Sequence, residues 1–172
     1  MRDYVQIVKQ EGETNNYYLG ARNLLLEREE FRRLLSHFHA PAGFLDPNKT
    51  AGGAARFWFG PKGTVTPLHY DDKNLLFGQI YGRKQVKLIP PFDIERVYND
   101  RTCFSAVDME RIDLEKYPLM RQVSIIDVIL EPGEFLLIPV GWWHWVKSLD
   151  ISISLSFPNF YSDSPMITWK NS

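Results

Sequence analysis

The sequence predicts a mainly β fold, a sandwich or jelly roll, within a single domain. After residue 55 the chain breaks into short runs of strand-forming residues between Gly and Pro turns, and one run, Ile151 to Phe157, alternates apolar residues with serines. Alternation is typical of a strand with two different faces, and many short strands with regular turns favour a sandwich or barrel. Helical spacing is confined to one upstream segment. We therefore expect a β core at about 54–160 after a helical region at about 17–40.

Eight runs are predicted as strands, with bounds set by the turn residues between them. They are Arg56–Phe59, Thr64–Tyr70, Leu75–Tyr81, Gln85–Ile89, Val123–Leu130, Phe135–Pro139, Trp143–Ser148 and Ile151–Phe157. The segment from Pro91 to Arg121 lacks this regularity. It is expected to be a long connection with short helical turns over one mouth of the barrel.

The helical pattern runs from Asn23 to His39. Its apolar residues share one face, as in an amphipathic helix; they are Phe31, Leu34, Leu35 and Phe38. His37 and His39 end the pattern, where a cationic side chain suits the helix dipole, so we interpret them as capping or exposed residues. The opening residues, MRDYVQIVKQEGE, resemble the middle of a strand-rich region, which leaves open that the chain is a fragment of a longer protein.

Composition narrows the class of protein. The 172 residues carry 20 Lys+Arg and 21 Asp+Glu, a formal net charge of -1, with 44% hydrophobic residues. This excludes a polybasic nucleic-acid binder and a disordered chain. Cys103 is the only cysteine, which excludes an intramolecular disulfide and a cysteine-based metal cluster. With no apolar run long enough for a membrane span and no signal-peptide pattern, we expect a soluble cytoplasmic protein.

A candidate metal site follows from three residues. His69 and Asp71 end one strand-like run, where period 2 turns them to the same side, and His144 begins another run. Two neutral imidazoles and one carboxylate form the facial triad that holds a non-haem Fe(II) while leaving positions open. A His beside an Asp is also a common structural pair. Thr66 and Lys84 favour the metal site, because a dicarboxylate cosubstrate needs charge-assisted hydrogen bonds when it loses its hydration.

Two segments resemble a known family. GTVTPLHYDDKNLLFGQIYGRKQVKLIPP and GEFLLIPVGWWHWVKSLDISISLSF look like the JmjC/cupin-like 2-oxoglutarate-dependent oxygenases, through the joint pattern T-P-x-H-x-D, G-x-K and P-x-x-W-W-H. Within that family they are most similar to the hydroxylase branch that includes the asparaginyl hydroxylase of hypoxia-inducible factor. The resemblance implies a double-stranded β-helix, a jelly roll of the cupin/JmjC type with flanking helices. It also implies Fe(II), 2-oxoglutarate and molecular oxygen.

The resemblance assigns roles by motif. His69, Asp71 and His144 match the iron ligands. Lys84 matches the residue that binds the C5 carboxylate of 2-oxoglutarate, assisted by Thr66. The remaining matches concern the same pocket: Tyr18 for a hydrogen bond to the C5 carboxylate, Phe77 for an aromatic wall, and Ser156 for the metal-binding end of the cosubstrate.

The sequence departs from the family at three places. Leu75 stands where several relatives carry an Asn four residues after the Asp ligand, with Asn74 expected on the opposite face. Ser156 is shorter than the Asn that relatives often carry at its position. The C1 carboxylate is therefore expected to depend on water or on the metal alone. Cys103-Phe104 offers no counterpart to the substrate-facing Arg-Gln pair of the asparaginyl hydroxylase, so that enzyme's substrate does not transfer.

Several residues have simpler interpretations. Trp142 and Trp143 are expected in the core, clamping the strand of His144, and Cys103 is expected to be inert. The serine row, Ser152, Ser154 and Ser156, either faces solvent or, as the family implies, lines a polar interior with the apolar row packed outward.

The predicted function is a 2-oxoglutarate-dependent dioxygenase that hydroxylates an unactivated C–H bond, with a protein or peptide side chain as the favoured substrate. A small-molecule or natural-product hydroxylase is the nearest alternative, and a non-catalytic metal-binding cupin module is a second. No direct nucleic-acid or membrane partner is expected. The tail from Pro158 to Ser172 lacks the periodicity of a long dimerisation helix, which leaves monomer and homodimer open.

Overall fold

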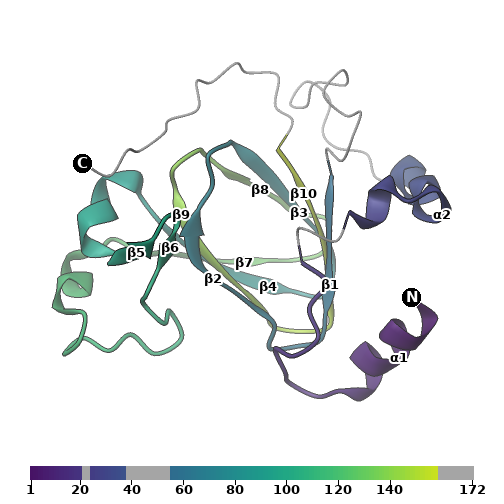
Figure 1. Ribbon diagram of the computed structural model, residues 1–172, viewed down its shortest axis with the longest axis horizontal. Coiled ribbons are helices and arrows are strands. Elements are labelled where there is room, and N and C mark those ends of the chain that lie inside the picture. Colours follow the sequence, from purple (N-terminus) through teal and green to yellow (C-terminus); the bar gives the residue numbers. More distant parts are fainter. Residues whose placement is uncertain (21–23, 38–54, 159–172) are drawn as a thin grey trace.

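The computed structural model describes residues 1–20, 24–37 and 55–158. Two antiparallel sheets form the walls of a barrel (Figure 1), one with strand order β1-β10-β3-β8 and one with order β5-β6-β2-β9-β4-β7. This confirms the predicted mainly β, jelly-roll fold. No helix in the described parts of the chain is long and apolar enough to cross a membrane.

The strands agree closely with the sequence pattern. The smaller sheet contains β1 (Arg56–Gly60), β10 (Ser152–Phe157), β3 (Leu75–Tyr81) and β8 (Phe135–Ile138). The larger sheet contains β5 (Asn99–Arg101), β6 (Phe104–Ser105), β2 (Val65–Tyr70), β9 (Trp143–Ser148), β4 (Lys84–Ile89) and β7 (Ile126–Leu130). β7 begins three residues later than predicted, because the Val123 N–H donates to the Met120 carbonyl at the end of the 3-10 turn η6 (Pro118–Gln122) and the Ser124 N–H donates to Asp93 Oδ2.

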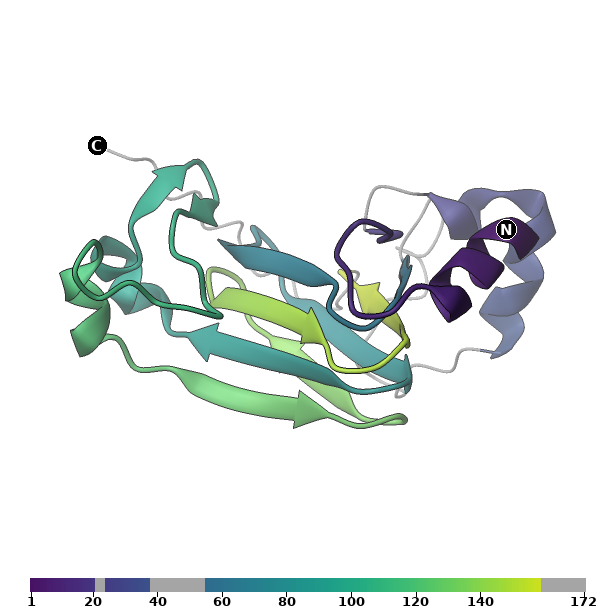
Figure 2. The ribbon, with the colours of Figure 1, turned by 90° about the horizontal axis from the view of Figure 1, so that it is seen from below.

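The connection between β4 and β7 contains more structure than expected. Besides the 3-10 turns η5 (Pro91–Arg96) and η6 (Pro118–Gln122), it contributes β5 and β6 to the larger sheet. These strands are too short to show alternation in the sequence. The connection lies beside the barrel end where β9 begins (Figure 2), and its buried residues pack on the outer face of the larger sheet. That cluster contains Leu68, Ile89, Val97, Val107, Met109, Met120, Trp143 and Trp145.

The N-terminus corrects one expectation. Residues Arg2–Gln10 form α1, not part of a strand-rich region. Tyr4 and Val8 lie one helical turn apart, with Val8 buried and the Tyr4 ring packed edge-on against Phe59 at a centroid distance of 5.4 Å. The alternation of Val5 and Ile7 imitates a strand, although the i,i+4 pair was the correct signal.

The single helix predicted from Asn23 to His39 is also wrong. The described part consists of η2 (Leu25–Glu27), α2 (Glu29–Arg32) and η3 (Arg33–His37), with the extended residue Arg28 between η2 and α2. Leu25 and Leu26 are both buried. Because neighbouring residues of an α-helix point about 100° apart, burying both favours an irregular turn here over a continuous helix. Asn23, Phe38 and His39 lie outside the described residues.

The serine row faces the barrel interior. Ser152, Ser154 and Ser156 are all buried. On the opposite face of β10, Leu155 and Phe157 join Leu26 and Leu76 in an apolar cluster. The N-terminal segments α1 and α2 lie on this side of the molecule, beside β1 (Figure 1). Of the two alternatives, the polar interior with an apolar outer face is therefore correct.

Candidate metal centre

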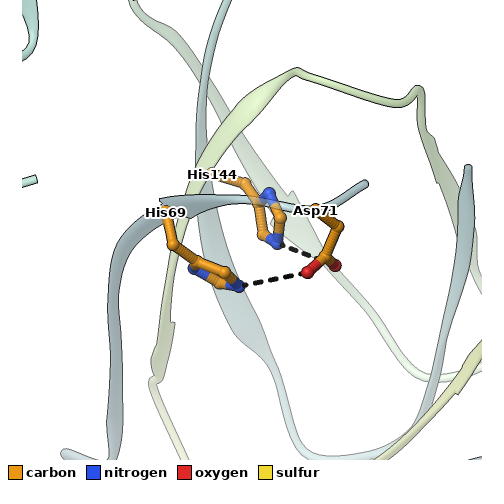
Figure 3. A group of neighbouring side chains, drawn as sticks. All are labelled: His69, Asp71 and His144. Atoms are coloured by element: carbon orange, nitrogen blue, oxygen red, sulfur yellow. Dashed lines mark ion pairs between the residues drawn. The ribbon is translucent and has the colours of Figure 1, made fainter. Parts of the chain in front are cut away.

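Two neighbouring strands bring the histidines together. β2 pairs antiparallel with β9, and His69 and His144 are direct partners across that pair. Their ring centroids lie 4.1 Å apart. Asp71 follows β2 directly, and its carboxylate turns toward both rings (Figure 3). A register fixed by the sheet therefore positions two of the three groups, and the end of β2 positions the third.

A β-bulge explains how Thr66 joins them. Between the pairs Thr66–Val146 and His69–His144, β2 advances three residues while β9 advances two. The extra residue means that Thr66 and His69 face the same side despite their odd spacing. Pro67 lies within the bulge, one of the positions in a sheet where a missing N–H is tolerated.

The three donor groups converge on one point. The Nε2 atoms of His69 and His144 lie 4.0 and 3.8 Å from the carboxylate oxygens of Asp71. One ligand atom from each residue lies within 4.8 Å of the other two, close enough to hold one ion. The described residues thus contain the predicted facial arrangement, with its open side toward a cavity.

Backbone carbonyls set the direction of both imidazoles. His69 Nδ1 lies 2.8 Å from the carbonyl oxygen of Pro67, and His144 Nδ1 lies 3.1 Å from that of Trp142. A carbonyl oxygen only accepts, so each Nδ1 carries the hydrogen and each Nε2 presents a lone pair to the centre. Both imidazoles are therefore held in the tautomer and orientation that metal ligation through Nε2 requires.

Burial keeps His144 in the protonation state that ligation needs. Desolvation, and secondarily the charge of His69, lowers the pKa of His144 to about 3, so this ring is neutral at physiological pH. Burial also raises the pKa of Asp71, although His69 opposes that shift. A bound cation would relieve the cost of burying this carboxylate.

A cavity of about 220 Å³ opens onto the three residues. Its walls come from both sheets and from the segment before β1. Besides the triad they include Tyr18, Arg56, Trp58, Thr66, Asp72, Lys73, Leu75, Phe77, Ile138, Val146, Ser156 and Pro158. This mixture of apolar walls and a few convergent polar groups is typical of a ligand site.

A buried ammonium lies beside this cavity. Lys84 is 1% exposed, and no acidic side chain of the described residues forms an ion pair with it. Its Nζ donates to the Tyr18 hydroxyl at 3.1 Å and lies 5.3 to 5.9 Å from the ring centroids of Tyr18, Phe77 and Trp58. Thr66 Oγ1 lies 3.5 Å from the same hydroxyl. Aromatic faces compensate a cation only in part, so this position favours an anion.

Comparison with known proteins identifies the family. The profile of the Cupin-like domain family matches residues 1–166. The chain belongs to the cupin-like JmjC family of 2-oxoglutarate oxygenases. Ferrous iron with 2-oxoglutarate and oxygen is the cofactor set of this family, and the His-Asp-His centre is the feature of the chain that fits it.

Several JmjC relatives are similar over the part of the chain that they share. JmjC domain-containing protein D of Dictyostelium discoideum is 46% identical over 66% of this chain and 26% of its own length. Lysine-specific demethylase JMJ30 of Arabidopsis thaliana is 43% identical and lysine-specific demethylase 8 of Xenopus tropicalis 42% identical, each over 58% of this chain and 24% of its own length. The chain thus spans about a quarter of these relatives, and the hydroxylase branch remains a prediction.

The JmjC site gathers the residues that the sequence singled out. Tyr18, Thr66 and Lys84 meet at one end of the interior, and Phe77 lies beside them. Ser156 lines the cavity, where its Oγ accepts a hydrogen bond from Trp58 Nε1 at 3.0 Å. Leu75 lines the same cavity, whereas Asn74 accepts a hydrogen bond from the backbone of Val140.

Two residues of β1 are among the cavity residues that the sequence analysis missed. Arg56 and Trp58 line the cavity from β1. They alternate with Phe57 and Phe59, and the pattern R-F-W-F does not reveal which face is inward because both faces carry aromatic residues. The inward direction follows from Leu155 and Phe157, which pack with Phe57 on the outer face.

The remaining assignments concern packing. Trp143 is fully buried in the outer cluster and Trp142 packs against the inner one, as expected. His37 ends η3 and is exposed. Cys103 is a free, partly exposed thiol. Its neighbour Phe104 is 40% exposed and stacks on the His69 ring at a centroid distance of 5.4 Å, which makes it an aromatic flank of the metal centre.

Proposed function

We propose that this chain is an Fe(II)- and 2-oxoglutarate-dependent dioxygenase that hydroxylates an unactivated C–H bond on a protein or peptide side chain. The observation that carries the proposal is Lys84. A fully buried ammonium without an acidic partner among the described residues, beside a cavity that ends at an open His-Asp-His centre, suits a dicarboxylate that also chelates a metal.

Each residue has a role in this proposal. His69, Asp71 and His144 hold the ion and leave coordination positions toward the cavity. Lys84, with the hydroxyls of Tyr18 and Thr66, binds the C5 carboxylate. When bound, Fe(II) with 2-oxoglutarate and oxygen supplies the oxidation: the keto acid loses carbon dioxide to become succinate, one oxygen atom enters succinate and the other enters the substrate C–H bond.

Apolar walls complete the arrangement. Trp58, Phe77 and Val146 line the cavity around the cosubstrate and exclude water from it. The protein thereby fixes orientation and keeps competing reactions away, which is its usual share of the work in a cofactor enzyme. A protein substrate is supported by the names of relatives that are lysine-specific demethylases.

The decisive experiment measures succinate formed from 2-oxoglutarate with Fe(II) and ascorbate, in the presence of a proteome-derived peptide library. We expect turnover by the wild type and a loss of at least about 100-fold for Asp71→Ala, because two imidazoles alone hold the ion poorly. Lys84→Met should raise the 2-oxoglutarate requirement while sparing Mn(II) affinity. Equal loss of both would contradict the role of Lys84.

Mass spectrometry of the same peptides separates the possible reactions. Gain of one oxygen atom indicates hydroxylation. The names of the relatives favour N-demethylation as a second candidate, and loss of a methyl group from methyllysine peptides would assign it. Turnover with small molecules alone would favour the small-molecule hydroxylase. No succinate under any of these conditions would favour a metal-binding module without catalysis.

A further inference from the structure

The metal-binding end of the cosubstrate lacks the expected polar partners. Leu75 offers only an apolar side chain to the cavity. Ser156 is 1% exposed, and its oxygen already accepts from the Trp58 indole, which leaves the hydroxyl one hydrogen to donate. A carboxylate that sheds its water in this cavity needs more than one hydrogen bond. Another residue must therefore face it.

Arg56 is at the right place. It is the backbone partner of Ser156 across the β1–β10 pair, and Ser156 is in turn the partner of Phe77 on β3. Arg56 lines the cavity on the same strand as Trp58, two residues away. Trp58 contacts Lys84. Along β1, the Trp58 indole therefore lies toward Lys84, and the Arg56 guanidinium lies two residues further along the cavity wall.

Among the described residues, the N–H donors of the Arg56 guanidinium are largely unpaired. Its contact with an acidic group is to Glu27 Oε1 at 3.9 Å, too long for a hydrogen bond, and both side chains are partly exposed. It donates no hydrogen bond to any other described residue. Five N–H donors in a planar fork match a carboxylate in two-point geometry, so the group is available to a ligand in the cavity.

We infer that Arg56, with the Ser156 hydroxyl, is the anchor for the C1 carboxylate of 2-oxoglutarate. The inference rests on the proposed function. The chain then has two cations for the two carboxylates of one ligand: Lys84 on the larger sheet for C5 and Arg56 on the smaller sheet for C1. The guanidinium from β1 compensates for the apolar side chain of Leu75 and the short side chain of Ser156. Arg56 is a binding and positioning residue in this account.

The test measures binding, independent of turnover, with Mn(II) in place of Fe(II). Isothermal titration calorimetry would compare 2-oxoglutarate with two analogues: 4-oxopentanoate, which has a methyl group in place of the C1 carboxylate, and 2-oxopentanoate, which has one in place of the C5 carboxylate. Arg56→Gln should weaken the binding of 2-oxoglutarate and of 2-oxopentanoate by about tenfold or more and leave the binding of 4-oxopentanoate unchanged. Lys84→Met should weaken the binding of 2-oxoglutarate and of 4-oxopentanoate and leave the binding of 2-oxopentanoate unchanged.

Matched variants separate the two-point hydrogen-bonding geometry of the Arg56 guanidinium from the effect of its positive charge. Arg56→Lys keeps the charge but loses the two-point geometry, so an intermediate loss is expected. Arg83→Gln removes an equal charge from the exposed pair with Asp150 and should change neither analogue. Lys73 also lines the cavity but is exposed in the turn after Asp71. An equal loss of affinity in Lys73→Gln would overturn the inference. It would indicate that positive charge at the cavity entrance attracts the ligand, without a specific contact from Arg56.

The failures of the two proposals are distinguishable. If wild-type protein with Mn(II) does not bind 2-oxoglutarate, the proposed function fails. If it binds and Arg56→Gln binds equally well, or weakens 4-oxopentanoate as much as 2-oxopentanoate, only the role of Arg56 is overturned. Unchanged thermal stability of Arg56→Gln without ligand would exclude misfolding as the cause of a loss.

Discussion

The two histidines of the metal centre obtain their ligating form from the backbone carbonyls behind them. Pro67 and Trp142 each lie two residues before the histidine that they orient. The hydrogen bonds that hold both rings therefore come from the local backbone. Neither carbonyl depends on a distant side chain. A change of residue at Pro67 or Trp142 therefore preserves the acceptor, provided the bulge and the turn keep their shape.

The neutral form of His144 makes the stability of the metal-free protein depend on pH. Its folded pKa of about 3 is below the ordinary 6.5, so the unfolded chain binds the proton first. The stability that this ring contributes is present above pH 6.5 and is lost as the pH falls toward 3. From pH 7 to pH 5 we expect a loss on the order of 2 kcal/mol, measured by urea denaturation in EDTA.

His144→Gln is the control for this effect. The variant has no imidazole to protonate at that position. Over the same pH interval, its free energy of unfolding should therefore fall by about 2 kcal/mol less than that of the wild type. The raised pKa of Asp71 acts in the opposite direction, but Asp71 is present in both proteins and its effect is removed by the comparison. Identical losses in the two proteins would contradict a neutral, buried His144.

At the scale of the elements, alternation and turn residues predicted most strands, and packing determined what they could not. Leu75–Tyr81 and Trp143–Ser148 were predicted to the residue, and a glycine lies just outside one end of each, Gly82 and Gly141. The bulge at Pro67 was invisible, since its evidence is the register of β9. The inward position of Arg56 depends on its neighbour Phe57 packing outward with Leu26 of η2 and with Leu155 and Phe157 of the paired strand β10, which are long-range contacts.

Two glycines in turns that connect the two sheets offer a paired test of the scaffold. Gly82 and Gly133 have φ angles of 66° and 92°, a region that side chains rarely adopt. A Cβ on Gly82 would lie 2.1 Å from the carbonyl oxygen of Ile151, whereas one on Gly133 would meet nothing within 4 Å. We expect Gly133→Ala to cost about 1–2 kcal/mol from backbone strain alone, and Gly82→Ala clearly more.

Urea denaturation of both variants measures the difference. Gly82 lies two residues before Lys84, so the displaced backbone should also weaken 2-oxoglutarate binding in Gly82→Ala. Gly133 lies in the turn after β7, away from the cavity lining, and its variant should bind the cosubstrate normally. Equal destabilisation by the two substitutions would contradict the close approach of Ile151.

The whole molecule separates its ligand groups between two sheets. The larger sheet carries the triad histidines and Lys84, and the smaller sheet carries Arg56, Phe77 and Ser156. A ligand that reaches both therefore connects the two walls of the barrel. Binding of this kind stabilises the folded state as a unit, because neither sheet alone provides the site.

This division predicts a thermal response that requires both ligands. With Mn(II) and 2-oxoglutarate at about 100 times their dissociation constants, the unfolding temperature should rise by about 10–20 °C. Mn(II) alone should give a smaller rise, and 2-oxoglutarate in EDTA almost none, because its keto and C1 oxygens then lack the ion. Calorimetry of the wild type and Lys84→Met measures this. The variant should keep the response to Mn(II) and lose the additional rise; a full response in Lys84→Met would mean that the cosubstrate does not reach from one sheet to the other.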